Sequence, residues 1–99
     1  MKTLNEIITI IAAHKSELMS MYKIKSIGVF GSYVRNEQTP QSDVDILVDF
    51  EEGATVSLFK LVDIENRLGG YLGAKVDLVL KRSLKPVISQ YINNEVVYL

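Results

Sequence analysis

The sequence predicts an α/β or α+β fold, in which a β-sheet is covered by helices. Two observations lead to this prediction. Apolar residues recur at helical spacing in three long segments, and between them lie shorter apolar or alternating segments that are typical of strands. The expected order is helix, strand, short helix, strand, helix, strand, helix. We expect residues 1–99 to form a single domain, because a chain of this length supports one small core.

The composition argues against several classes of function. Eleven basic and twelve acidic side chains give a net charge of -1, so no overall field attracts the chain to nucleic acid. The absence of cysteine excludes disulfides, thiolate nucleophiles and zinc-thiolate sites. No apolar run approaches the roughly 18 to 20 residues that a membrane span requires. We therefore expect a soluble, cytoplasmic protein that does not contact membranes.

The first helix is predicted to begin with a capping box. Thr3 and Glu6 have the spacing at which each side chain binds the backbone N–H of the other. Apolar residues at helical spacing then continue to about Met21. Residues 24–30 are rich in β-branched and aromatic types, which predicts a buried strand that ends at Gly31.

The middle of the chain is predicted to hold a second strand between two helices. Residues 32–37 can form one or two helical turns, and a polar loop follows them. Apolar and polar residues alternate over 43–48, the pattern of a strand. We expect Thr55 or Ser57 to cap the next helix, and we expect that helix to end at the glycine pair 69–70.

The C-terminal part is predicted to contain a third strand and a last helix. Residues 75–80 alternate apolar side chains with Asp77, as a strand does. Ser83 is the expected cap of the last helix, and Pro86 is tolerated because it lies in the first turn. Residues 96–99 can add a short terminal strand. The buried side of the helix is expected to comprise Leu84, Val87, Ile88, Tyr91 and Ile92.

Two carboxylates of the second strand point to metal chemistry. Alternation places Asp43 and Asp45 on one face, with Cα atoms about 6.5 to 7 Å apart. Carboxylates this close repel each other, and a divalent cation such as Mg²⁺ is the natural compensation. Asp77 joins them if its strand pairs beside theirs. Three carboxylates around two metal ions suit phosphoryl or nucleotidyl transfer.

The end of the first strand offers a phosphate site. Gly31 lets the backbone turn tightly and approach a ligand, and N–H groups that open the following helical turn can point at a phosphate. Ser32 adds a hydroxyl donor. Arg35, one helical turn further, either balances phosphate charge or solvates the loop, and the sequence leaves both readings open.

Other polar residues are assigned no role in the site. Asp49 is expected to be a solvated turn residue at the far end of its strand. His14, the only histidine, is expected to be solvated or packed on its helix. The basic residues Lys81, Arg82 and Lys85 are expected to solvate a loop and a helix start, with contact to a polyanion or an acidic partner as the alternative.

Each feature of the site is weak alone, but together they resemble a known signature. Residues 31–35, continuing to 42–48, are similar to that of the DNA polymerase β-like nucleotidyltransferase superfamily. With residues 75–79 and the short length, the chain most resembles the minimal nucleotidyltransferases (MNT), over nearly its whole extent. The resemblance implies a small mixed sheet with helices. One departure is that Val34 and Asn36 stand where members commonly carry Ala and Gly, which leaves the ligands in place.

The resemblance implies a role for each residue of the site. Asp43 and Asp45 match the pair that holds both metal ions. Asp77 matches the third carboxylate, which touches one metal and helps to deprotonate the attacking hydroxyl. Gly31 and Ser32 match the turn that grips the triphosphate of the nucleotide. The implied cofactor is Mg²⁺, as two ions, and the usual donor is ATP.

The function expected from this resemblance is Mg²⁺-dependent transfer of AMP from ATP to a hydroxyl, with release of pyrophosphate. Larger members append a domain that binds the acceptor, so here another molecule should bring it. In the minimal family that molecule is typically a HEPN-domain toxin, which receives AMP on a tyrosine, and the MNT protein is the antitoxin. Two alternatives stay open: a non-enzymatic antitoxin that neutralises its partner by contact, and a nucleotide sensor.

Overall fold

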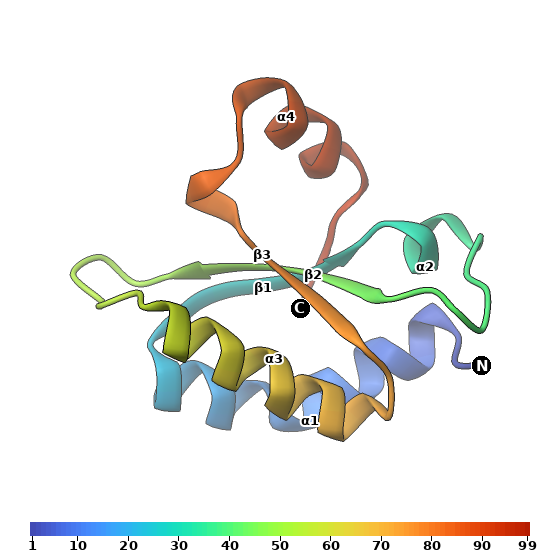
Figure 1. Cartoon of the computed structure of the whole chain (residues 1–99), viewed down its shortest axis with the longest axis horizontal. Coiled ribbons are helices and arrows are strands. Elements are labelled where there is room, and N and C mark those ends of the chain that lie inside the picture. Colours follow the sequence, from blue (N-terminus) through green and yellow to red (C-terminus); the bar gives the residue numbers. More distant parts are fainter.

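The computed structural model describes residues 1–99 and shows a four-stranded sheet between helices (Figure 1). The strand order is β3-β2-β1-β4; β1 runs antiparallel to β2 and β4, and β2 runs parallel to β3. The predicted mixed sheet flanked by helices is therefore confirmed. In chain order the elements are α1 (Leu4–Tyr22), β1 (Ile24–Phe30), α2 (Ser32–Arg35), β2 (Val44–Phe50), α3 (Leu58–Leu72), β3 (Val76–Leu80), the 3-10 turn η1 (Lys81–Ser83), α4 (Pro86–Glu95) and β4 (Val97–Tyr98).

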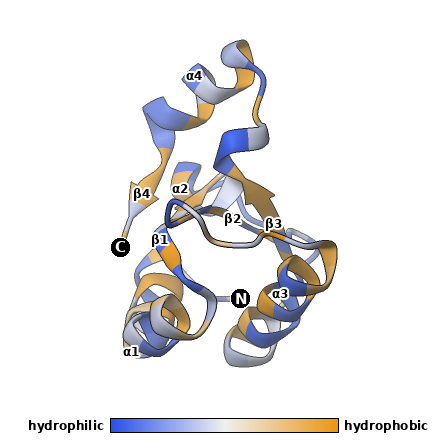
Figure 2. Cartoon of the chain, turned by 90° about the vertical axis from the view of Figure 1, so that its left-hand side faces the viewer, coloured by the Kyte–Doolittle hydropathy of each residue, from blue (hydrophilic) through white to orange (hydrophobic).

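The helices cover the two faces of the sheet unequally. Helices α1 and α3 lie side by side on one face, and α4 stands alone over the other, as the side view in Figure 2 shows. The main core fills the space between the sheet and the first pair, where Val44, Ile46 and Val48 have no exposed surface. Because side chains alternate along a strand, the odd-numbered residues of β2 face α4.

Local signals fixed the starts of two helices as predicted. The Thr3 hydroxyl accepts a hydrogen bond from the Glu6 N–H at 3.2 Å, and the Glu6 carboxylate accepts one from the Thr3 N–H at 3.0 Å. Ser57 caps α3 by accepting a hydrogen bond from the Lys60 N–H at 3.2 Å. No helix of the structure is both long enough and apolar enough to cross a membrane.

The predicted end of α3 at the glycine pair is wrong. The helix continues through Gly69 and Gly70 to Leu72, and it ends where Gly73 adopts a left-handed conformation with φ 61°. Two helical glycines cost about 1 kcal/mol each relative to alanine. Leu68 and Leu72, one turn apart, are both fully buried, and their packing outweighs that cost.

The prediction for α4 is only partly correct. Pro86 is the first helical residue, as expected, but the residue before the helix is Lys85, which makes no capping hydrogen bond with its side chain. Of the predicted buried side only Ile92 is buried, at 6% exposure. Val87 is 81% exposed and Tyr91 62% exposed, because nothing in the chain covers the outer side of this helix. The amphipathic pattern is real, but most of it faces outward.

Candidate active site

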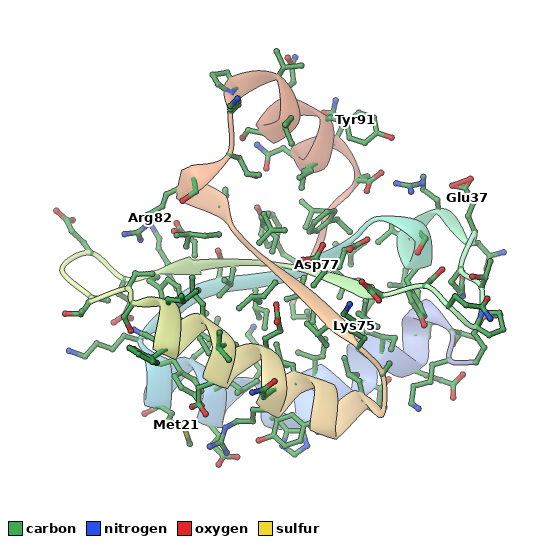
Figure 3. The ribbon with its side chains drawn as sticks, viewed as in Figure 1. Met21, Glu37, Lys75, Asp77, Arg82 and Tyr91 are labelled. Atoms are coloured by element: carbon green, nitrogen blue, oxygen red, sulfur yellow. The ribbon has the colours of Figure 1, made fainter.

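Strand pairing brings the carboxylates to one end of the sheet. Asp45 of β2 lies directly opposite Asp77 of β3 in the parallel register. This is the strand pairing that the prediction from sequence required for Asp77 to join Asp43 and Asp45. Adjacent strands lie about 4.8 Å apart, so the two backbones are close. Asp43 stands two residues earlier, just before β2. The apolar residues next to Asp45 and Asp77 in sequence, such as Ile46 and Val76, are buried in the main core. Asp45 and Asp77 therefore lie on the opposite face of the sheet, which is the face that α4 covers; Figure 3 labels Asp77.

The turn after β1 lies against Asp45. Phe30 pairs with Asp45 across the antiparallel register, and Gly31 follows with φ 80° and ψ -149°. Only glycine adopts this backbone conformation readily. A Cβ atom on Gly31 would lie 2.0 Å from Oδ2 of Asp45, so the absence of a side chain is also what makes room for the carboxylate. The sequence predicted that the backbone at Gly31 approaches a ligand. In the structure, the group that it approaches is the carboxylate of Asp45.

The site accumulates negative charge. Partial burial raises the pKa of Asp45 to about 6, and repulsion from Asp77 and then Asp43 adds to the shift, while Arg35 opposes it. Asp77 and Asp43 are therefore close enough to act electrostatically on Asp45. As the side chains stand, however, no three His, Cys, Asp or Glu side chains are arranged to hold a metal ion. The donor set suits a hard divalent cation, which would relieve the repulsion, but its oxygens are not gathered around one point.

The raised pKa of Asp45 predicts an unusual dependence of stability on pH. The folded chain binds the Asp45 proton more tightly than the unfolded chain, so this group removes stability as the pH rises from about 4 to about 6. Asp45→Asn abolishes that loss. In thermal unfolding with a chelator present, we expect the variant to match the wild type at pH 4 and to melt a few degrees higher at pH 7.5. The same difference in melting temperature between variant and wild type at both pH values would contradict the raised pKa of Asp45.

Sequence reasoning missed Glu95, the last residue of α4. The Gly31 N–H donates to Oε2 of Glu95 at 2.6 Å, and Nη1 of Arg35 donates to both carboxylate oxygens of Glu95 at 2.9 and 3.1 Å. Nε of Arg35 donates to Glu37 at 2.6 Å. Arg35 is thus held between two carboxylates and is not simply a solvating side chain. No local pattern could reveal Glu95, which lies 60 residues from Arg35.

Residues assigned no role prove to be structural. The prediction that Asp49 is a solvated turn residue is wrong, because Arg82 donates to its carboxylate at 3.1 Å and to the carbonyl of Phe50 at 2.7 Å. Turn η1 carries Arg82 back to the end of β2, where Figure 3 labels it. His14 stacks on Tyr71 with ring centroids 3.6 Å apart, which confirms its packed role.

A cavity of about 630 Å³ adjoins Asp43. Its lining combines the polar loop 39–43 with residues before α1 and around the end of α3, and it includes Lys2 and Lys75. This volume lies in the range of small-ligand sites. Asp43 is the only one of the three carboxylates in its wall, so the cavity lies beside the carboxylate cluster and does not enclose it.

A family comparison decides what this arrangement belongs to. The model of the nucleotidyltransferase domain family matches residues 11–99, a range that contains all six predicted site residues. The chain belongs to this nucleotidyltransferase family. The assignment agrees with the signature at 31–48 and with the geometry around Asp45.

Two relatives match this nucleotidyltransferase along its whole length. The protein adenylyltransferase MntA of Thermococcus cleftensis is 52% identical over 99 residues, which cover 100% of this chain and 98% of that protein. A Methanocaldococcus jannaschii protein, named as a candidate protein adenylyltransferase, is 49% identical over 100 residues, with 100% of both chains covered.

Solved structures share the fold. A candidate minimal nucleotidyltransferase has a TM-score of 0.75 and 34% identity, covering 94% of this chain and 95% of its own. A toxin-antitoxin complex with AMP-PNP has a TM-score of 0.71 and 27% identity, covering 87% and 69%. A tri-AMPylated HEPN toxin of Shewanella oneidensis in complex with MNT antitoxin has a TM-score of 0.63 and 25% identity, covering 87% and 66%. The resemblance to minimal nucleotidyltransferases is confirmed.

Proposed function

We propose that this nucleotidyltransferase transfers AMP from ATP to a tyrosine hydroxyl of a HEPN-domain toxin and thereby acts as its antitoxin. The observation that carries the proposal is the pairing of Asp45 with Asp77 beside the Gly31 turn, with Asp43 two residues away. The two relatives that match the whole chain, one named a protein adenylyltransferase and the other a candidate protein adenylyltransferase, support AMP as the transferred group.

The three carboxylates would have two roles around the α-phosphate of ATP, metal binding and proton acceptance. Asp43, Asp45 and Asp77 would hold two Mg²⁺ ions, which neutralise charge on the phosphates when bound. The acceptor oxygen forms a bond to the α-phosphorus, the bond from that phosphorus to the bridging oxygen breaks, and pyrophosphate leaves. Asp77 would accept the proton of the acceptor hydroxyl, a role that its exposure, greater than that of Asp43 or Asp45, supports.

The turn after β1 would bind the triphosphate. The hydroxyl of Ser32 and the backbone at the start of α2 supply donors, and Arg35 contributes positive charge. Because Nε and Nη1 of Arg35 already donate to Glu37 and Glu95, its contribution to phosphate binding is mainly electrostatic.

The outer side of α4 supports a protein as the acceptor. Val87, Ile88 and Tyr91 leave apolar surface uncovered on the helix that stands over the carboxylate face of the sheet. Uncovered apolar surface beside a site is typical of a protein interaction surface. A HEPN-domain protein docked there would bring its hydroxyl to the side on which Asp45 faces.

The reaction is tested with ATP labelled at the α-phosphate, Mg²⁺ and the HEPN-domain partner. We expect label on the partner, and we expect none there when the label is on the γ-phosphate, because that phosphate leaves in pyrophosphate. If the partner carried no label from the α-phosphate after incubation with the protein, ATP and Mg²⁺, the proposed AMP transfer would be wrong.

The exposed face of α4 also favours the rival function, neutralisation by contact alone. An assay of protection from the toxin with Asp43→Asn/Asp45→Asn separates the two. Loss of protection while the variant still binds the toxin supports catalysis. Full protection by the double variant would establish contact as sufficient.

A further inference from the structure

We propose that Glu95 is a positioning residue for nucleotide binding, which holds the Gly31 turn in its productive conformation. The proposal rests on the proposed function in one respect, that the turn binds the triphosphate. Glu95 itself does not touch the reacting atoms in this account. It acts through the Gly31 backbone and through Arg35.

The Glu95 carboxylate is mostly buried and accepts three hydrogen bonds, of which the one from Gly31 is partly buried and the two from Arg35 are exposed. It accepts the Gly31 N–H at 2.6 Å and Nη1 of Arg35 at 2.9 and 3.1 Å, and the side chain is only 15% exposed. Hydrogen bonds to an ionised group are roughly twice as strong as neutral ones. Both ends of the segment from Gly31 to Arg35, which includes all of α2, are therefore fastened to one carboxylate.

The sheet fixes where Glu95 stands. Strand β4 follows Glu95 within two residues and pairs with β1, with Val97 opposite Val29 and Tyr98 opposite Gly28. Continuing that antiparallel register places Glu95 opposite Gly31. The position of Glu95 is thus set by the pairing of β4 with β1, the strand that ends just before Gly31, and not by a flexible loop.

The turn needs such a fastening because glycine is flexible. At φ 80° and ψ -149°, Gly31 occupies a region that glycine can also leave easily. Without a partner for its N–H, the turn would sample other conformations, and ATP binding would have to order it at a cost in affinity. Arg35, which also pairs with Glu37, offsets part of the charge of Glu95 and so reduces the repulsion between this carboxylate and the triphosphate.

Kinetics of Glu95→Ala and Glu95→Gln test the role. We expect the KM for ATP to rise about tenfold in the alanine variant and about threefold in the glutamine variant, whose amide oxygen still accepts one hydrogen bond, with kcat within about twofold. Glu17→Gln, an exposed residue of α1, is the matched control and leaves both constants unchanged. A purely structural role would lower the folded fraction, and hence the apparent kcat, without raising KM.

Two other outcomes overturn the proposal. An unchanged KM in folded Glu95→Ala would show that the turn needs no fastening, and a lower KM would show that Glu95 competes with the phosphates for the Gly31 N–H. The dissociation constant of ATP, measured by calorimetry with Mg²⁺ and no acceptor, gives the same comparison without catalysis. A wild type that binds ATP but transfers no AMP therefore refutes the proposed function alone, and one that binds no ATP refutes both.

Discussion

Replacing Asp45 by asparagine is expected to lower the rate of AMP transfer by at least about 10²- to 10³-fold, because the variant loses a carboxylate that, in the proposed function, holds the metal ions. Asp45 lies opposite Asp77 in the parallel register and lies against the Gly31 turn. The measurement is the initial rate of pyrophosphate release with saturating ATP, Mg²⁺ and acceptor.

Asp49→Asn is the matched control for this variant. Asp49 lies on the same strand and the same face, about 13 Å further along, and its carboxylate pairs with Arg82. We expect its loss to reduce stability slightly and to leave the transfer rate within about twofold. Equal loss of activity in both variants would mean that charge on this face, and not the position of Asp45, governs the reaction.

Gly31→Ala is expected to disable the site by displacing Asp45. The new Cβ would meet Oδ2 of Asp45 at 2.0 Å, and the backbone at φ 80° disfavours any side chain. The carboxylate has to move by an ångström or more, a misplacement that can cost about 10²-fold in rate. The measurements are the transfer rate and the free energy of unfolding.

Gly53→Ala separates the steric clash from the backbone strain. Gly53 has φ 82°, almost the same as Gly31, but a Cβ there meets no atom within 4 Å. We expect this control to lose about 1 kcal/mol of unfolding free energy and no activity. If Gly31→Ala lost no more than Gly53→Ala in either measurement, the turn would not be packed against Asp45 as described.

The sequence predicted the parts of this protein that depend on neighbouring residues. The capping box of Thr3 and Glu6 and the alternation in β2 both follow from spacings of two or three residues. The roles of Asp43 and Asp45 were inferred from the same kind of spacing and stay predictions. Asp77 could be proposed because its strand is apolar apart from one charge. Its alignment with Asp45, however, depends on pairing between strands more than thirty residues apart, which only the structure shows.

The parts that the sequence did not predict depend on distant contacts. Glu95 and Arg82 bind partners 64 and 33 residues away, and no local pattern marks either residue. The glycine pair 69–70 is a local signal for a helix end, but the burial of Leu72, which depends on tertiary packing, extends α3 beyond it. The amphipathic pattern of α4 predicts a buried face, but such a pattern does not reveal whether the apolar face packs within the chain or against a partner.

The most direct test of the central claim is peptide mass analysis of the HEPN-domain partner after incubation with this nucleotidyltransferase, ATP and Mg²⁺. The account predicts AMP on a tyrosine of the partner, present with the wild type and absent with Asp45→Asn. A partner that is neutralised by the wild type while carrying no AMP would contradict it.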